Sequence, residues 1–322
     1  MKNRHSLLFG LLICLFLTAC AAPKAEAPVP TPALPANMAQ DDGGLPLLHV
    51  YIAEEETVIP MDIESYVCGV VAGEMKNDWP LEALRAQAIL ARTFVLKFVA
   101  EKDSRYEGAD ISTDISEAQA YNTEAVNNRI REAVSSTAGQ ILVQADGSLP
   151  YTWFHAHSGG ITALARESLD WQQAEPAYTL VTDGLDSPDA PDSAKVWEAE
   201  FTKEDFLAAC RQCGARAQSI EDIRVKKKGD SGRAVTLEVD GLEVSAARLR
   251  IALGSTVMRS TLLTELSSDG ETVRMAGRGY GHGVGMPQWG AYALAQDGLR
   301  GEDIALHYYN GLHLVTLWTS AQ

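Results

Sequence analysis

Glu74 is the side chain in this 322-residue sequence whose position best suits acid–base chemistry. It stands where a short helix opened by Asp62 should end, and the residues after it form a hinge up to Trp79. Pro80 then fits the first turn of a second, longer helix. An apolar repeat at helical spacing marks that second helix, at Leu81, Leu84, Ala88, Ala91 and Val95. A carboxylate at such a junction can act as a proton donor.

Three polar side chains interrupt the Ala- and Leu-rich surface of the second helix, namely Arg85, Gln87 and Arg92. A glutamate backed by two arginines can be an acid–base group, and it can also be a capping or ion-paired residue on the surface. Spacing alone favours the second interpretation, because structural ion pairs also perturb carboxylates. The local pattern therefore leaves both roles of Glu74 open.

A second group of reactive side chains lies in FHAHSGGIT, residues 154–162. The segment follows a strand-like run and ends in Gly-Gly, so His155, His157 and Ser158 are expected at a tight turn with exposed backbone amides. Serine and histidine together suggest a nucleophile and its base. No G-x-S-x-G elbow is present, however, and His157 adjoins Ser158 in the sequence instead of facing it. These features argue against a nucleophilic serine.

The third group is the glycine-rich segment GRGYGHGVGMPQWGA, residues 277–291. It is no P-loop, because no Gly-Lys-Ser/Thr follows, and no register gives G-x-G-x-x-G. Alternating glycines allow a close approach of backbone or ligand. His282 can carry a proton at physiological pH, and it can equally be a histidine bonded to the main chain at a packed strand end.

The elements that must position these groups mix helices and strands without regular alternation. That pattern predicts an α+β fold, a single large mixed domain with a central helix pair around Glu74 and several β-hairpins. Leu48 to Ile59 is expected as one strand closed by Pro60. Hairpins are expected around Asp-Gly pairs, joining 140–143 to 150–154, 235–239 to 242–244, and 264–266 to 272–275. Further helices are expected at Asn127–Ala138, Thr202–Cys210, Pro287–Gln296 and Gly301–Tyr309.

The segment YVCGVVAGEMKNDWPLEALRAQAILARTF, residues 66–94, resembles the signature of the stage II sporulation protein D family, which includes proteins called amidase enhancers. The glycine-rich segment resembles a second signature of that family. Two shorter runs also match, D-x-x-x-x-Q-x-Y at Asp114 to Tyr121 and F-H-x-x-S-G-G-x-T at Phe154 to Thr162. The resemblance extends from about Val58 to Tyr309 and is weakest over residues 170–266.

The resemblance implies that Glu74 is the catalytic acid of a peptidoglycan lytic transglycosylase. Such an enzyme cleaves between N-acetylmuramic acid and N-acetylglucosamine in strands stripped of stem peptides and leaves 1,6-anhydro ends. The acid must start protonated, so its pKa must be raised, and Met75 and Trp79 can supply the apolar setting. Because a cation would lower that pKa, Arg92 is assigned to a substrate carboxylate or to structure.

The resemblance also implies a set of residues that line a glycan cleft. They share polar or aromatic side chains suited to sugar hydroxyls and rings, and they are Gln87, Arg92, Gln119, Tyr121, His155, Ser158, His282 and Gln288. Some relatives bind zinc near the histidine turn through downstream cysteines. Here Ile161 and Glu167 stand where those thiols are expected, so no metal or other cofactor is predicted.

Two other classes of function remain open. The first is a non-catalytic amidase enhancer or glycan-binding module, with a cell-wall amidase as its partner. The second is an ordinary hydrolase, which needs a second carboxylate as base, for which Asp78 and Asp114 are the nearby candidates.

The amino terminus resembles a bacterial lipoprotein signal. A basic start and a short apolar run precede Leu17-Thr18-Ala19-Cys20. We expect residues 1–19 to be a signal peptide, Cys20 to be acylated, residues 20–44 to be a Pro- and Ala-rich tether, and residues 45–322 to be the catalytic domain. The domain is then expected on the outer face of the cell membrane. The lipobox differs from the membrane-spanning anchor of the sporulation members, so sporulation and vegetative wall turnover both stay open.

The composition is acidic, with a formal net charge of -16. Nucleic-acid binding requires a basic surface, so that class of partner is excluded. Of five cysteines, Cys14 falls in the signal and Cys20 at the lipid site. Cys210 and Cys213 form C-R-Q-C without a second ligand pair, which favours free or disulfide-paired thiols over a metal.

Overall fold

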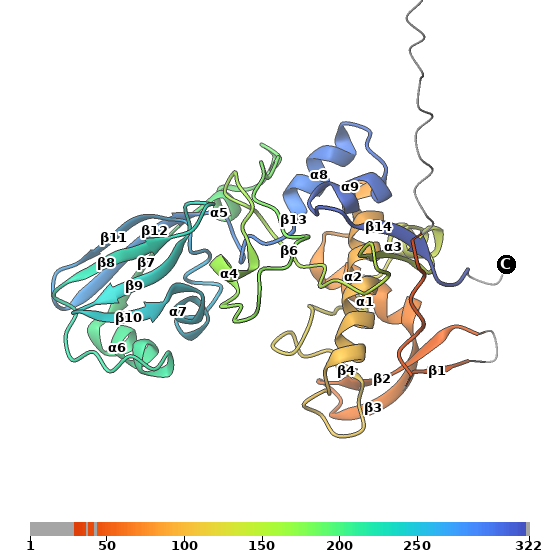
Figure 1. Ribbon diagram of the computed structural model, residues 1–322, viewed down its shortest axis with the longest axis horizontal. Coiled ribbons are helices and arrows are strands. Elements are labelled where there is room, and N and C mark those ends of the chain that lie inside the picture. The colour runs from red at the N-terminus through yellow and green to blue at the C-terminus, as the bar shows by residue number, and fades with distance from the viewer. Residues whose placement is uncertain (1–28, 37, 42–43, 320–322) are drawn as a thin grey trace, which may run out of the picture.

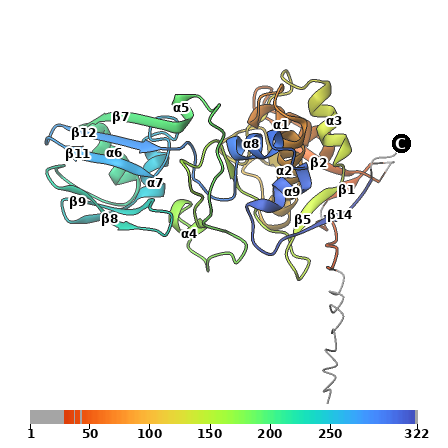
Figure 2. The same ribbon diagram turned by 90° about the horizontal axis from the view of Figure 1, so that it is seen from above.

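The computed structural model describes residues 29–36, 38–41 and 44–319, and it divides into two lobes (Figure 1). We call residues 46–155 and 286–319 the helical lobe and residues 196–278 the β lobe. Residues 156–195 and 279–285 are the linking segments, which lie between the lobes in both views (Figures 1 and 2). Each lobe has its own cluster of buried apolar side chains. The α+β class and the central helix pair are as the sequence predicts.

The helical lobe is built around the long helix α2. Its Ala- and Leu-rich sequence favours helix, and four other helices pack against it. The helices are α1 (Ile63–Glu74), α2 (Leu81–Glu101), α3 (Asn128–Ser136), α8 (Gln288–Gln296) and α9 (Gly301–His307). The strands are β1 (Ala39–Gln40), β2 (Pro46–Ile52), β3 (Thr57–Asp62), β4 (Ile111–Ser112), β5 (Gln140–Val143), β6 (Phe154–His155), β13 (Met286–Pro287) and β14 (His313–Thr316).

Two strand predictions are wrong in this lobe. Residues 48–59 do not form one strand, because the chain turns after Ile52 and returns as β3 in an antiparallel hairpin that contains Pro60. Strand β5 does not pair with residues 150–154. It pairs with β14 from the far end of the chain, and β6 pairs in parallel with β13. The Asp146-Gly147 turn is present, but tertiary pairing takes precedence over the local hairpin signal.

The expected tether reaches into the folded lobe. β1 pairs with β2, and the side chains of Val29, Leu34 and Met38 pack against the core. Backbone pairing thus already holds residues 39–40, before the expected boundary at residue 44. The expected signal peptide and Cys20 lie outside the described residues. None of the helices in the described part of the chain combines the length and hydropathy needed to cross a bilayer.

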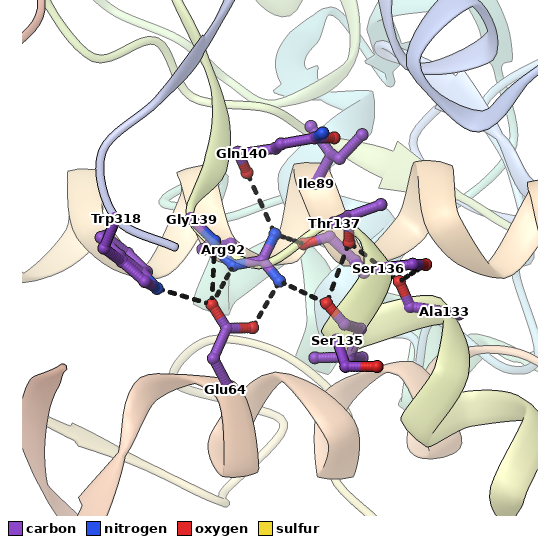
Figure 3. A network of polar contacts seen from close by, with 12 residues as sticks. Glu64, Ile89, Arg92, Ala133, Ser135, Ser136, Thr137, Gly139, Gln140 and Trp318 are labelled. Carbon is purple, nitrogen blue, oxygen red and sulfur yellow. Dashed lines mark hydrogen bonds and ion pairs between the residues drawn. The ribbon is translucent and has the colours of Figure 1, made fainter. Parts of the chain in front are cut away.

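A buried ion pair ties α1 to α2 (Figure 3). Arg92 is fully buried and donates to both carboxylate oxygens of Glu64, at 3.0 and 2.5 Å, and to the carbonyl of Gln140 at 3.0 Å. Glu64 also accepts hydrogen bonds from the Gly139 amide and the Trp318 indole. One carboxylate thus connects two helices, the start of β5 and the carboxyl end of the chain.

The β lobe consists of two three-stranded antiparallel sheets and two helices. The hairpins β9–β10 and β11–β12 are confirmed, and Asp240 and Gly241 both have positive φ, as a two-residue hairpin turn requires. Cys210 and Cys213 are free thiols. The elements are β7 (Val196–Thr202), α6 (Lys203–Gln212), β8 (Ile223–Lys228), β9 (Ala234–Val239), β10 (Leu242–Ser245), α7 (Ala246–Ala252), β11 (Leu263–Ser268) and β12 (Thr272–Arg278), with α4 (Ala165–Ser168) and α5 (Asp192–Lys195) before them.

Candidate functional site

Glu74 is the last residue of α1 and lies in a cavity of about 500 Å³ at the end of that helix. Asp62 caps the start of the helix by accepting a hydrogen bond from the Ser65 amide at 2.9 Å. The helix ends at Met75, whose extended backbone turns the chain into the hinge. The half-buried Glu74 carboxyl lines this shallow hollow, which is open on one side. The cavity is lined by Ala72, Gly73, Met75, Lys76, Asn77, Asp78 and Ala125.

Two donors from distant parts of the chain hold the carboxyl group of Glu74. The Ala120 amide donates to Oε1 at 2.7 Å, and the side-chain amide of Gln288 donates to Oε2 at 3.2 Å. The first contact depends on Gly73, because a Cβ there would stand 2.6 Å from the backbone nitrogen of Tyr121. The absence of a side chain at Gly73 lets the loop that carries Ala120 lie directly on α1.

Burial raises the pKa of Glu74 above the usual value of 4.5, and the two hydrogen bonds from Ala120 and Gln288 oppose that rise. A carboxylate at a helix carboxyl end also meets the negative end of the helix dipole, which disfavours its charged form. Met75 and Trp79, in the hinge that follows Glu74, are both buried. The group therefore keeps its proton to a higher pH than an exposed glutamate does.

Replacing Glu74 by Gln should stabilise the protein at pH 8 and have little effect at pH 4. A raised pKa in the folded state means that the folding free energy from this group is complete below 4.5 and is lost as pH rises through the folded pKa. Glutamine resembles the protonated form and loses nothing. Urea unfolding at pH 4, 6 and 8 measures the difference, and an equal loss of stability at all three values would contradict the raised pKa.

Three aromatic side chains form a cluster beside the hinge. The ring centroids of Trp79 and Trp289 are 4.6 Å apart, and that of Tyr292 is 5.2 Å from each. They line a neighbouring cavity of about 480 Å³, which shares Lys76 and Asp78 with the cavity at Glu74. Aromatic rings at the edge of a cavity can stack on the apolar faces of sugars. The sequence analysis did not find Tyr292, which lies one helical turn after Gln288.

The hinge is fixed from the side by two asparagines. Asn77 donates to the Ala125 carbonyl at 2.9 Å, and Asn127 donates to the Asn77 carbonyl at 3.0 Å. The same Asn127 caps α3 by accepting from the Ile130 amide at 3.0 Å. The start of α3 therefore sets the position of the residues that follow Glu74.

Two expected substrate-binding residues on α2 line neither the cavity at Glu74 nor the one beside it. Arg92 is fully enclosed in the ion pair with Glu64, so of its two expected roles we retain the structural one. Gln87 is also fully buried, and its amide atoms have no partner among the described residues. The helical pattern could not distinguish these side chains from surface ones, because both interrupt an apolar face.

Gln119 and Tyr121 flank the residue that contacts Glu74. The Gln119 side chain is buried, and its amide has no partner among the described residues. Tyr121 is half-buried and stacks on Tyr66, with ring centroids 5.6 Å apart. Their loop thus brings the backbone of Ala120 to the site, while neither side chain bonds to Glu74. A backbone donor of this kind cannot be predicted from the residue types in a sequence.

The expected glycan-facing histidines His155 and His282 lie beside each other, with ring centroids 5.6 Å apart, but they do not line the cavity at Glu74. His155 is buried and donates through Nδ1 to the Val284 carbonyl at 3.2 Å, and burial lowers its pKa well below the usual value. His282 lines a different cavity with Arg250 and Cys213. Burial, with the charge of Arg250, lowers the pKa of His282 to about 3, so both rings are neutral at physiological pH.

The histidine turn continues into a cluster that the sequence analysis missed. Ser158 is fully buried, so it cannot line a cleft as expected. Its hydroxyl and amide both donate to Asp186, a residue from the weakly patterned part of the chain. His157 Nδ1 accepts from the Gly159 amide at 3.0 Å and lies 3.4 Å from Asp186. Both side chains thus contact Asp186, and the Ser158 hydroxyl donates to that carboxylate and not to His157, so the two do not form a nucleophile–base pair.

The side chains at this turn do not fit a metal ion. Glu167, one of the positions where relatives were expected to carry thiols, accepts hydrogen bonds from the Asp230 amide and the Ser231 hydroxyl. Within the described residues, no three side chains of His, Cys, Asp or Glu cluster closely enough to hold an ion.

Comparison with known proteins gives the family. The family model described as stage II sporulation protein matches residues 51–144, the part of the helical lobe that contains Glu74 and Ala120. Stage II sporulation protein D of Bacillus amyloliquefaciens is 30% identical over 279 residues, which cover 82% of this chain and 77% of that protein. The chain belongs to the stage II sporulation protein D family. A model described as a domain of unknown function matches residues 159–285, the β lobe with most of the linking segments.

Two other relatives differ in how much of their own length the match covers. An uncharacterized protein of Brachyspira hyodysenteriae is 29% identical over 83% of this chain and 71% of its own length. The amidase enhancer of Bacillus subtilis is 27% identical over 77% of this chain, but the match covers only 40% of that longer protein. The matches to members of the stage II sporulation protein D family thus include both lobes.

Proposed function

We propose that this chain is a lytic transglycosylase of peptidoglycan. Its substrate is the β-1,4 bond between N-acetylmuramic acid and N-acetylglucosamine in glycan strands without stem peptides. The observation that carries the proposal is the carboxyl group of Glu74, which is held by two donors in a cavity and has a raised pKa. A carboxyl group whose pKa is raised in this way is suited to donate a proton.

The proposed reaction needs one acid and no activated water. Glu74 gives its proton to the oxygen that bridges the two sugars, and the bond from C1 of N-acetylmuramic acid to that oxygen breaks. The same carboxylate then takes the proton of the C6 hydroxyl, whose oxygen closes on C1 to form the 1,6-anhydro ring. Glu74 ends protonated, ready for a further cycle. The aromatic cluster of Trp79, Trp289 and Tyr292 would hold sugars next to the cleaved bond.

The proposed setting is the outer face of the cell membrane. Acylation of Cys20 would hold the protein there, with the Pro- and Ala-rich residues that follow it as a tether. The names of the relatives support cell-wall remodelling linked to sporulation, and the name amidase enhancer supports a wall amidase as partner.

The amidase enhancer is also the source of a second candidate, a glycan-binding module that stimulates an amidase without cleaving glycan. An ordinary hydrolase is a third, and Asp78 is its best base because it lines the cavity of Glu74. Asp114 fits less well. Hydrogen bonds from Ser116 and Tyr106 lower its pKa, and it lines none of the cavities beside Glu74.

One experiment separates these candidates. The purified protein is incubated alone with peptide-free glycan strands, and the products are identified by mass spectrometry. A transglycosylase gives fragments with 1,6-anhydro ends, and a hydrolase gives reducing ends that are heavier by one water. If the strands stay intact, the glycan-binding module is the one candidate that remains.

Changing Gln288 to Leu should move the alkaline limb of the pH–activity profile to higher pH. The Gln288 amide donates to Glu74 and favours its charged form, so its loss raises the pKa of Glu74 further. Activity requires the protonated acid and therefore persists to higher pH. The profile of anhydro-product formation between pH 5 and 9 measures this shift. A uniform loss of activity at every pH would mean that Gln288 acts only on substrate binding or folding.

A further inference from the structure

A separate cavity of about 370 Å³ lies where the linking segments meet the β lobe. It shares no lining residue with the cavity at Glu74. Its walls combine the histidine turn, the loop of residues 183–188 and the ends of β7 and β12. The charged and ring side chains that line it are His157, Asp183, Asp186, Lys195 and Arg278.

The two acidic side chains of this cavity accept hydrogen bonds from amides of the surrounding backbone. Asp186 accepts from the amides of Ser158 and Gly160, at 3.0 and 3.3 Å, and from the Ser158 hydroxyl. Asp183 accepts from the Leu185 amide at 2.9 Å. The carboxylate of Asp186 is therefore engaged by the loop and has a side-chain exposure of only 5%, whereas Asp183 is exposed and makes that one contact within the described part of the chain.

The donor groups of the cavity, in contrast, keep N–H hydrogens that can bind a ligand. Arg278 is exposed, and its guanidinium makes no hydrogen bond or ion pair with the residues that the structure describes. Lys195 donates to the Pro188 carbonyl at 2.7 Å and lies 3.9 Å from the exposed carboxylate of Asp192, so it keeps further donor hydrogens. Because Nδ1 of His157 accepts from the Gly159 amide, the proton of the neutral ring is on Nε2. These groups can donate to a ligand without breaking an existing contact.

The cavity is connected to the candidate site through a short stretch of chain. Ser187 and Pro188 line it, and the next residue, Asp189, lines the cavity that contains Trp79 and Trp289. Three consecutive residues span about 7 Å at most. The second cavity in turn shares residues with the one at Glu74. The three hollows thus follow one another from α1 to the β lobe.

We propose that this third cavity binds the lactyl carboxylate of an N-acetylmuramic acid residue away from the cleaved bond, with Arg278 as the main ligand. The proposal rests on the proposed function. In peptidoglycan every second sugar carries this group, and the stem peptide is attached through it. Removing the peptide leaves an anion that a planar guanidinium can bind through two parallel hydrogen bonds. With the peptide attached, the group is a neutral amide followed by a bulky chain.

The test measures binding and product separately. Peptide-free glycan oligomers are compared with the same oligomers whose lactyl carboxylates have been converted to methylamides. Binding is followed by calorimetry in the Glu74→Gln protein, so that no strand is consumed. Arg278→Met is combined with that change, and Arg274→Met is the matched control. Arg274 lies on the same strand and is paired with Glu200 and Asp269 instead of facing the cavity.

Arg278→Met should weaken binding of the carboxylate oligomers about tenfold and leave binding of the methylamides unchanged, and Arg274→Met should change neither. Equal weakening of both ligands, no weakening at all, or the same effect from Arg274→Met would overturn the assignment. Because affinity is measured without turnover, these outcomes do not depend on whether the wild-type protein forms anhydro ends. Absence of those ends would reject the transglycosylase proposal alone.

Discussion

Replacing Glu74 by Gln should lower the rate of anhydro-product formation by about 10² to 10⁴-fold, the range expected when a general acid is lost. The variant should still fold, because glutamine has the same shape: its carbonyl can accept from the Ala120 amide, and its NH2 can donate to Gln288 once the Gln288 side-chain amide turns its oxygen toward it. It should also bind peptide-free strands as the wild-type protein does. Product formation is measured by mass spectrometry and affinity by calorimetry.

Two variants control this experiment. Glu132→Gln makes the same change of charge on the exposed surface of α3 and should retain full activity. Asp78→Asn removes the other acid of the cavity, and this variant should still form anhydro products. If Glu74→Gln keeps the wild-type rate, Glu74 is not the acid. If Asp78→Asn abolishes the reaction, a two-carboxylate mechanism must replace the one proposed.

Arg92→Met should destabilise the protein by about 3–5 kcal/mol, the cost of removing one partner of a buried ion pair. Arg92 is fully buried, and Glu64, with 14% exposure, would keep only the hydrogen bonds from Gly139 and Trp318. Because the network joins α1, α2 and β5, its loss should lower the midpoint of unfolding for the whole lobe (Figure 3). Urea denaturation of the wild type and variant measures the change.

The double variant Glu64→Leu with Arg92→Met shows whether the unpaired charge causes the loss. With both charges removed, no carboxylate is left uncompensated, so the double variant should be more stable than Arg92→Met alone. A variant of Arg92 that unfolds like the wild type but binds glycan more weakly would contradict the structural role. That result would restore Arg92 as a substrate ligand.

Local sequence determined the elements around Glu74. The capping residue Asp62, the hinge and the apolar repeat of α2 all act within a few residues of the chain, and the helix pair formed where they predict. The Asp-Gly turns placed two hairpins of the β lobe in the same way. At β5 the local hairpin signal failed, because this strand pairs with β14 from the carboxyl end of the chain.

The role of a polar residue was decided by tertiary structure alone. Arg92 and Gln288 were equivalent candidates in the sequence, yet one is enclosed in an ion pair and the other reaches Glu74 across 214 positions. The Ala120 amide reaches the same carboxyl across 46 positions, and a backbone group leaves no residue pattern. The sequence by itself thus fixed where an acid stands on its helix. Only packing between distant segments decided what surrounds that acid, because burial and hydrogen bonding, which set its pKa, are properties of the folded chain.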